Sequence, residues 1–267
     1  MLTQDMERQE KLDSAECLTE QGYLKKLGIK IVILSRGRWD SISTTKLLPD
    51  WIEVVVPESQ AEKYAAEIDN PLITTPDSVV GLGMLRNWCL KNFSEESVIM
   101  VDDDINHFYR LTGERTEAVT DELEFVQILI NTCVMSRDLG AKVFGFFQTD
   151  IRKFRGYDPF SLCCWVGTII GVNDRKYEFR NDKFKVDIDF CLQNLLVERV
   201  VWCDNRYYAS NYKDMNTGGN AEFRSETEYN KSLESLCEKW GDCLKVRKYK
   251  NQNRVSLNIS RKQAIKL

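Results

Sequence analysis

Three consecutive aspartates, Asp102, Asp103 and Asp104, follow directly on the apolar segment 97–101. The segment predicts a buried strand, which would deliver the carboxylates to the sheet edge where open α/β folds bind their ligands. Adjacent carboxylates raise one another's pKa, and a bound divalent cation removes that cost. Such oxygen ligands favour Mg²⁺ or Mn²⁺, with one or two carboxylates and substrate phosphates on the metal. The triplet therefore predicts a site for a metal ion and a diphosphate, with a solvated acidic turn as the alternative.

Other phosphate chemistries fit the sequence less well. A phosphatase of the haloacid dehalogenase type would use Asp102 as nucleophile and Asp104 as general acid, but it would carry them on its first strand. Here the pair follows the fourth predicted strand. No GxxxxGK[ST] loop occurs, which excludes a P-loop site, and the Gly81-Leu82-Gly83 segment is only half of a dinucleotide-binding fingerprint.

The composition narrows the chemistry further. His107 is the only histidine, so multi-histidine zinc sites are excluded, and His107 itself is either an extra metal ligand or a packing side chain. The nine cysteines form no CxxC pair, which indicates reduced thiols in a reducing compartment. The sequence shows no secretory signal and no apolar stretch of membrane-spanning length. We therefore expect a soluble, cytoplasmic protein without membrane contact.

Strands alternate with helices in the first part of the chain, which is typical of βαβ crossovers and predicts a mostly parallel sheet covered by helices. The expected strands there are 29–34, 51–56, 71–75 and 97–101, and the expected helices are 39–48, 60–68 and 80–93. Beyond the triplet we expect helices at 121–138, 187–196 and 226–240, strands at 142–147 and 199–203, and one or two strands within 160–172. Asp121 is the expected N-cap of its helix. We divide the chain into a polar lead-in (1–27), one α/β domain (28–243) and a basic segment packed on the same domain (244–267).

The ordered segments IKIVILSRGRWDS, WIEVVVPES, GLGMLRN and VIMVDDDI resemble the nucleotide-sugar half of a GT-A glycosyltransferase. The segments GFFQTDIRKF, PFSLCCWVGTIIGV and FKVDIDFCLQNLL more narrowly resemble phage DNA glycosyltransferases associated with TET-type 5-methylcytosine oxidases. Those enzymes are thought to place a sugar on 5-hydroxymethylcytosine. The resemblance spans roughly residues 28–220 and implies a Rossmann-like GT-A fold.

The resemblance also implies roles for single residues. Those implied for nucleotide-sugar binding are Ser35, Arg36, Arg38, Arg86, Asp102 and Asp103. Asp102 and Asp104 are implied as ligands of Mn²⁺ or Mg²⁺. For Arg36 and Arg38 the alternative is a solvated loop, and for Arg86 it is an ion pair on a helix surface.

Asp187 and Asp189, in VDIDF, resemble the acidic motif near the acceptor in GT-A enzymes. An inverting transfer needs a carboxylate that takes the acceptor's proton, and Asp187 is the first choice with Asp189 in reserve. Val186 stands where many relatives carry Glu. The alternative is an N-cap and a first-turn acid of the helix at 187–196.

The basic residues gather at the C-terminal end. Residues 244–267 hold eight basic residues and no acid, so the net charge of −4 divides into +8 there and −12 over residues 1–243. Such a patch could contact DNA phosphates; a basic tail or a final strand pair facing the acidic body is the alternative. The residues expected to contact DNA or the acceptor are Trp165, Lys245, Arg247, Lys248, Lys250 and Arg254. Phe147 and Tyr157 are further aromatic candidates, and the Gly218-Gly219-Asn220 loop is either a lid or a passive turn.

Together these observations predict a metal-dependent enzyme that moves a sugar from a nucleotide sugar, expected to be a UDP-sugar, to 5-hydroxymethylcytosine in DNA. Three alternatives stay open: the same fold with a glycan, lipid or protein acceptor, a Mg²⁺-dependent phosphatase, and a non-catalytic DNA-binding module. Both inversion and retention fit the acidic motif, and the sequence indicates no particular sugar or oligomeric state.

Overall fold

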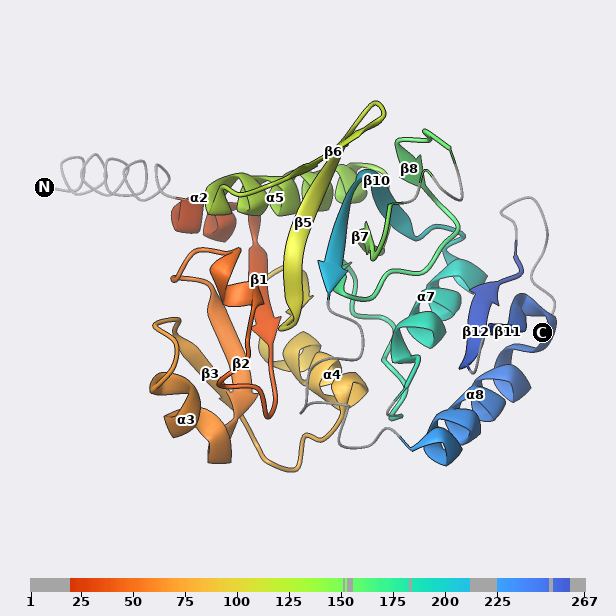
Figure 1. Cartoon of the computed structure of the whole chain (residues 1–267), viewed down its shortest axis with the longest axis horizontal. Helices are drawn as coiled ribbons and strands as arrows, with labels where there is room; N and C mark the ends of the chain where they lie inside the picture. The colour runs from red at the N-terminus through yellow and green to blue at the C-terminus, as the bar shows by residue number, and fades with distance from the viewer. Residues whose placement is uncertain are drawn as a thin grey trace, which may run out of the picture.

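A ten-stranded sheet forms the centre of the protein, with helices on both of its faces (Figure 1). The computed structural model of the chain describes residues 20–150, 152, 156–182, 184–211, 225–249 and 252–259. Within these residues, seven of the ten strands run in one direction, and three run against it. The fold is the predicted α/β architecture with a mostly parallel central sheet.

One half of the sheet is entirely parallel. In spatial order its strands are β3 (Leu72–Thr75), β2 (Glu53–Pro57), β1 (Ile29–Leu34) and β4 (Ser97–Asp102). The other half is mixed and continues with β9 (Ile169–Val172), β7 (Val143–Phe147), β10 (Trp202–Asn211), β5 (Ile105–Thr112) and β6 (Arg115–Ala118). The short β8 (Phe160–Ser161) pairs with β10.

The two faces of the sheet bury different helices, because successive residues of a strand point to opposite faces. Ile31 and Ile33 of β1 pack in a core with α2 (Glu20–Leu27) and α5 (Glu122–Asp138). Val32 and Leu34 of the same strand pack in a second core with α4 (Leu82–Asn92) and α7 (Val186–Val197). The shorter helices are α3 (Ala61–Ala65) and the 3₁₀ turns η1 (Thr44–Lys46), η2 (Glu58–Gln60) and η4 (Gly241–Cys243).

The local sequence determines where helix α5 begins and ends. The Asp121 side chain accepts hydrogen bonds from the backbone N–H of Leu123 (2.8 Å) and of Glu124 (3.0 Å), so the predicted N-cap is confirmed. Phe125 and Leu129 point from this helix into the core. The helix ends at Asp138, as the sequence predicted.

Three elements differ from what the sequence predicted. The helix predicted at 39–48 is reduced to the single turn η1, because the backbone N–H of Ser43 and of Thr44 both donate to the Asp103 carbonyl. Strand β10 begins later and runs much further than the predicted strand at 199–203. The hairpin of β5 and β6, which follows the acidic triplet, was not predicted.

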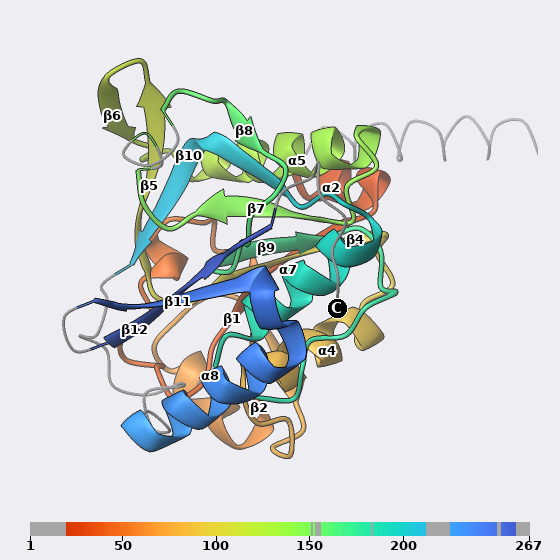
Figure 2. The same cartoon turned by 90° about the vertical axis from the view of Figure 1, so that its right-hand side faces the viewer.

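The C-terminal residues form a unit of their own on the sheet face that carries α7. Helix α8 (Glu226–Trp240) is followed by a hairpin of β11 (Leu244–Tyr249) and β12 (Gln252–Leu257). Leu236 and Trp240 of α8 pack with Ile188 and Leu192 of α7, which anchors the unit (Figure 2). The basic segment thus contains the strand pair named among its alternatives.

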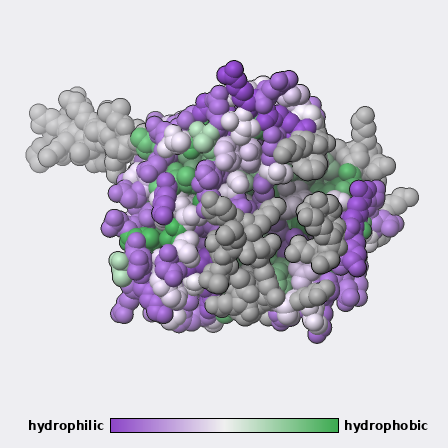
Figure 3. Space-filling model, viewed as in Figure 1, coloured by the Kyte–Doolittle hydropathy of each residue, from purple (hydrophilic) through white to green (hydrophobic). Residues whose placement is uncertain are grey.

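The surface is mostly hydrophilic on the face shown in Figure 3, with apolar side chains scattered over it. None of the described helices combines the length and the apolar character needed to cross a bilayer. The eight cysteines within the described ranges are free thiols, and six of them are buried, whereas Cys17 lies outside those ranges.

Candidate active site

The acidic triplet lies at the carboxyl end of β4, the strand at which the parallel half of the sheet meets the mixed half. Asp102 is the last residue of the strand, in register with Leu34 of β1. Its backbone N–H donates to the Thr168 carbonyl (2.9 Å), and its carbonyl accepts from Thr44 Oγ1 (2.6 Å). The loops after β1 and before β9 therefore meet at this point, as expected for ligand sites of open α/β sheets.

The Asp103 side chain belongs to a buried hydrogen-bond network with the loop that follows β1. Ser35 Oγ donates to one carboxylate oxygen (2.5 Å), and Arg38 Nη1 donates to the other (2.5 Å). The Tyr64 hydroxyl completes the network at 2.6 Å from Ser35 Oγ, and it accepts the backbone N–H of Arg38. Burial raises the pKa of Asp103 to about 6, although Arg38 and Ser35 oppose that rise. Ser35, Arg38 and Asp103 thus form the frame of the site, and Arg38 is not a solvated loop residue.

Arg38 also reaches the third aspartate. Its Nη1 lies 3.1 Å from Asp104 Oδ2, and Asn211 Nδ2 donates to Asp104 Oδ1 at 3.4 Å. Asn211 is the last residue of β10, so Asp104 is held between the two halves of the sheet. Arg36 points elsewhere, since its Nη1 donates to the Val79 carbonyl before α4 (3.1 Å).

Arg86 comes from α4 and is 1 % exposed, so the helix-surface ion pair is wrong. Its Nη2 donates to the Gly167 carbonyl (2.6 Å) and to Asp102 Oδ1 (3.1 Å). Its Nε and Nη1 are buried, and no described residue accepts a hydrogen bond from them. Buried donors of this kind usually have a partner. Arg86 therefore has hydrogen-bonding capacity to spare beside Asp102.

Asp187 lies on the first turn of α7 and approaches this group from the opposite side. A Cβ atom built on Gly167 would stand 2.5 Å from Asp187 Oδ2, so the carboxylate rests directly against the Gly167 backbone. The charge of Asp187 also contributes to raising the pKa of Asp102. The N-cap of α7 is Lys185, so the interpretation of Asp187 as an N-cap is wrong.

The four carboxylates outnumber the cations around them. Asp102, Asp103, Asp104 and Asp187 face only Arg38 and Arg86 within the described part of the site, which leaves an excess of two negative charges when all are ionised. Burial is the main cause that raises the pKa of Asp102 to about 8, with smaller contributions from the neighbouring carboxylates. A divalent cation would balance this excess, so the residues fit such an ion.

The described residues hold no group of three or more His, Cys, Asp and Glu side chains arranged around a metal position. Both oxygens of Asp103 are held at 2.5 Å, whereas the contacts of Asp102 (3.1 Å) and Asp104 (3.1 and 3.4 Å) are longer, so Asp102 and Asp104 are the carboxylates of the triplet better placed to take a cation. Two carboxylates suit Mg²⁺ or Mn²⁺, which take their other ligands from water and phosphate. His107 is exposed on β5 and stacks on the Tyr109 ring at 5.5 Å.

Asp189 is not brought to the acidic cluster. Two residues along a helix correspond to about 200°, so Asp189 points away from Asp187. It is fully buried, and its Oδ1 accepts from Lys239 Nζ and Trp240 Nε1 of α8, both at 2.7 Å. Its Oδ2 accepts from Gln193 Nε2 at 2.7 Å. Asp189 therefore joins α7 to α8, a role that sequence analysis missed because the partners lie far along the chain.

The predicted DNA-contacting residues are spread over several elements. Lys245, Arg247 and Lys248 are exposed on β11, and Arg254 lies opposite Arg247 in the register of the hairpin. Trp165 is partly buried between the cores of α7 and α8. The residues that lie outside the described ranges are Lys250, Gly218, Gly219, Asn220, Arg261, Lys262 and Lys266.

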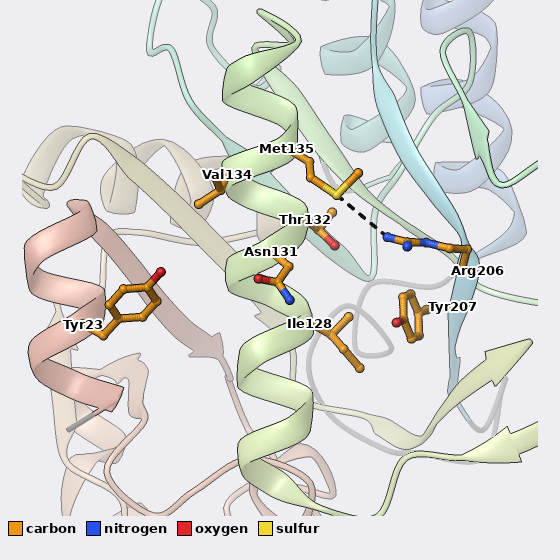
Figure 4. A pocket seen from close by; sticks show the side chains of 8 residues that line it. All are labelled: Tyr23, Ile128, Asn131, Thr132, Val134, Met135, Arg206 and Tyr207. Carbon is orange, nitrogen blue, oxygen red and sulfur yellow. Dashed lines mark hydrogen bonds between the residues drawn. The ribbon is translucent and has the colours of Figure 1, made fainter. Parts of the chain in front are cut away.

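A separate cavity of about 280 Å³ opens on the other face of the sheet (Figure 4). Tyr23 of α2 and Met135 of α5 border it, and Arg206 and Tyr207 of β10 close one side. None of the described residues that line it carries a carboxylate, and it lies on the α5 face, so it is separate from the acidic site.

Comparison with known proteins agrees with this geometry. Residues 29–219 match the family described as TET-Associated Glycosyltransferase. No curated protein matches the chain.

Solved structures with a similar fold include S. aureus TarS 1–349, at 17% identity and a TM-score of 0.41. That match covers 68% of this chain, which spans 60% of the TarS chain. Glucosyl-3-phosphoglycerate synthase from Mycobacterium tuberculosis, in complex with Mn²⁺, UDP and glucosyl-3-phosphoglycerate, matches at 11% identity and a TM-score of 0.49, over 89% of both chains. Because the family match covers most of the sequence, this chain belongs to the TET-associated glycosyltransferases.

Proposed function

We propose that this enzyme transfers a sugar from a UDP-sugar to 5-hydroxymethylcytosine in DNA, with Mn²⁺ or Mg²⁺ bound at the acidic cluster. The observation that carries the proposal is a series of contacts: Asp102 from β4 bonds to Arg86, Arg86 bonds to the Gly167 carbonyl, and Asp187 from α7 rests against Gly167. Asp102 belongs to the strand end that would bind the donor, and Asp187 would come from the acceptor side. Family membership supports a glycosyl transfer over the phosphatase and the non-catalytic alternatives.

The donor's diphosphate would lie at the loop after β1 and the N-terminal end of α4. Asp102 and Asp104 would hold the cation, which when bound offsets the charge that develops on the departing diphosphate. Arg86 would supply its unused Nε and Nη1 donors to the donor substrate. Ser35 and Arg38 would keep Asp103 and Asp104 in place while the donor binds. UDP with Mn²⁺ or Mg²⁺ is also present in structures of the mycobacterial synthase.

Asp187 would act as the base in a transfer with inversion. The hydroxymethyl oxygen of the acceptor attacks the anomeric carbon of the sugar, and the bond from that carbon to the diphosphate oxygen breaks. The bonding electrons leave with UDP, and the hydroxyl proton passes to the Asp187 carboxylate. Asp189 would hold α7 in position through its bonds to α8.

The exposed Lys and Arg side chains of the C-terminal hairpin support a nucleic-acid acceptor. Lys245, Arg247 and Lys248 project from a unit that packs directly on α7. Phosphate contacts from such residues give affinity that falls as salt rises. The +8 segment would therefore hold the DNA backbone while the acidic body, at −12, carries out the chemistry.

The test is incubation of the enzyme with Mn²⁺, a panel of nucleotide sugars, and DNA with or without 5-hydroxymethylcytosine. Mass spectrometry of the released nucleosides should show a sugar's mass added to 5-hydroxymethylcytosine only. Asp187→Asn serves as the matched control and should bind UDP but transfer no sugar. If no DNA gains mass while UDP is still released in the presence of a glycan, lipid or protein, the DNA acceptor is wrong and the glycosyltransferase assignment stands.

A further inference from the structure

Four aromatic side chains form a row on the sheet face that carries α7. Tyr109 of β5 is in register with Tyr208 of β10, which is in register with Phe147 of β7. Partners in register point to the same face, so the three rings lie side by side across three strands. The Tyr109 and Tyr208 rings stack at 4.9 Å, and His107 stacks on Tyr109 at 5.5 Å. We call His107, Tyr109, Tyr208 and Phe147 the aromatic row.

The opposite face of the same strands is an ordinary core. Phe108 and Tyr207 stack on each other there, and Phe108 also stacks on Phe125 of α5. The aromatic row, by contrast, is accessible to solvent: His107 is exposed, and Tyr109 and Tyr208 are half-buried. Phe147 packs against the core of α4 and α7, whereas His107, Tyr109 and Tyr208 belong to none of the described hydrophobic clusters.

The aromatic row borders the acidic site along one of its sides. Gln148, the residue after Phe147, bonds to Thr168, and Thr168 follows the glycine on which Asp187 rests. On the neighbouring strand, Asn211 bonds to Asp104 and lies three residues beyond Tyr208, a distance of roughly 10 Å along a strand. The aromatic row therefore lies next to the residues that contact Asp104 and the Gly167 loop.

Among the residues that the structure describes, the charged side chains next to the aromatic row do not suit phosphate groups. Asp104 lies at one end, and Arg152 at the other end is taken up by Asp150 through Nη2 (2.7 Å) and by the Gly113 carbonyl through Nη1 (2.5 Å). The phenol and phenyl rings of the row are neutral, and because His107, Tyr109 and Tyr208 stack on one another, the outer faces of this stack are the ones open to a further flat group. A flat neutral group, such as a nucleobase, is the ligand that such a surface stacks, and aromatic platforms of this kind hold single-stranded nucleic acids.

We propose that unpaired bases of the acceptor DNA stack on the aromatic row, next to the nucleotide that receives the sugar. This inference rests on the proposed DNA acceptor and names the form in which it binds. In an intact duplex the faces of the bases are covered by their neighbours, so the enzyme would act on single-stranded or locally opened DNA. The basic hairpin would hold the backbone, and the aromatic row would hold the bases.

The test compares Tyr109→Leu and Tyr208→Leu with the wild-type chain. The probe is a dye-labelled single-stranded oligonucleotide with one 5-hydroxymethylcytosine, and fluorescence anisotropy measures its affinity in the presence of Mn²⁺ and UDP. Each Leu variant should bind about 5- to 150-fold more weakly, the range for loss of one stacked base. Tyr109→Phe keeps the ring and should bind like the wild type. The matched control is Tyr23→Leu, since Tyr23 is 40% exposed on α2, on the opposite face.

A thermal shift with UDP and Mn²⁺ should be equal in all variants and shows that the donor half is intact. The result that contradicts the stacking platform is a set of Leu variants that keep that shift, bind the oligonucleotide like the wild type and modify a fully paired duplex as fast as a single strand. The proposed function would stand in that case. If the wild-type chain neither binds nor modifies any DNA but still binds UDP, the DNA acceptor fails and the stacking platform with it. If a Leu variant loses the thermal shift, the Phe and Ala variants of the same tyrosine are compared instead. The Ala variant must then bind the oligonucleotide more weakly than the Phe variant, or the stacking platform is wrong.

Discussion

Gly167 and Asp187 are in such close contact that no side chain fits between them: a Cβ atom at position 167 would stand 2.5 Å from Asp187 Oδ2. The contact fixes the carboxylate beside the Gly167 carbonyl, which accepts a hydrogen bond from Arg86. The glycine is therefore needed for the position of the proposed base.

Gly167→Ala should lower the rate of transfer at least about tenfold, because a misplaced base loses its alignment with the acceptor hydroxyl. The affinity for UDP should change little, since Asp102 and Asp104 are not displaced. Steady-state kinetics with separate donor and acceptor titrations measure both. A Gly167→Ala enzyme with the wild-type kcat would contradict the placement of Asp187.

Asp104→Asn should reduce turnover roughly 100-fold or more while the protein stays folded, because one of the two carboxylates available to the cation is lost. The dependence of the rate on Mn²⁺ should shift to higher concentrations. Asp103→Asn is the matched control. It removes a charge from the network of Ser35 and Arg38, so its main effect should be a lower melting temperature. Equal Mn²⁺ dependence of the wild type and Asp104→Asn would rule out Asp104 as a ligand.

Asp189→Asn should lower the free energy of unfolding by about 2–3 kcal/mol, since Lys239 and Trp240 lose a buried charged acceptor. Transfer should fall mainly through kcat, because α7 carries Asp187. Urea denaturation gives the first quantity and kinetics give the second. Trp240→Phe removes one of the same hydrogen bonds and should show a smaller effect of the same sign. If Asp189→Asn unfolds at the wild-type urea concentration, the link between the helices is not significant.

The raised pKa of Asp102 should be detectable in the pH dependence of the protein's stability. Its pKa is about 8 in the folded protein, against about 3.9 for an ordinary aspartate. The folded state holds this proton more tightly, so the metal-free protein should lose free energy of unfolding from this group as the pH rises from about 4 to about 8. Asp102→Asn removes this dependence, so its stability relative to the wild type should increase over that interval. Urea denaturation at several pH values measures the difference, and a difference that is constant with pH would contradict the assignment.

The strands of the parallel half could be predicted because β1, β2 and β4 are buried on both faces and appear as continuous apolar runs. Strand β5 could not, since INHFYRLT combines a core face with an open aromatic face. The predicted helix at 39–48 failed for a tertiary reason, because its amides bond to the Asp103 carbonyl.

The candidate site could be predicted only in part. The acidic triplet and Asp187 were evident from their sequence context, but their convergence depends on how α7 packs on the sheet. Gly167 was missed, and the only sequence signal for it was a lone glycine in CCWVGT. Asp189 was interpreted as a reserve base because nothing in VDIDF indicates a partner in α8.

The bond from Asp189 to Lys239 and Trp240 also bears on how relatives of this enzyme can be recombined. The family match ends at residue 219, which would suggest that everything after it can be exchanged as an independent module. The junction of such an exchange should instead lie beyond α8, because Lys239 and Trp240 of α8 donate hydrogen bonds to Asp189 of α7, a helix inside the matched region. A chimera joined after Trp240 would keep that helix supported and exchange only the basic hairpin.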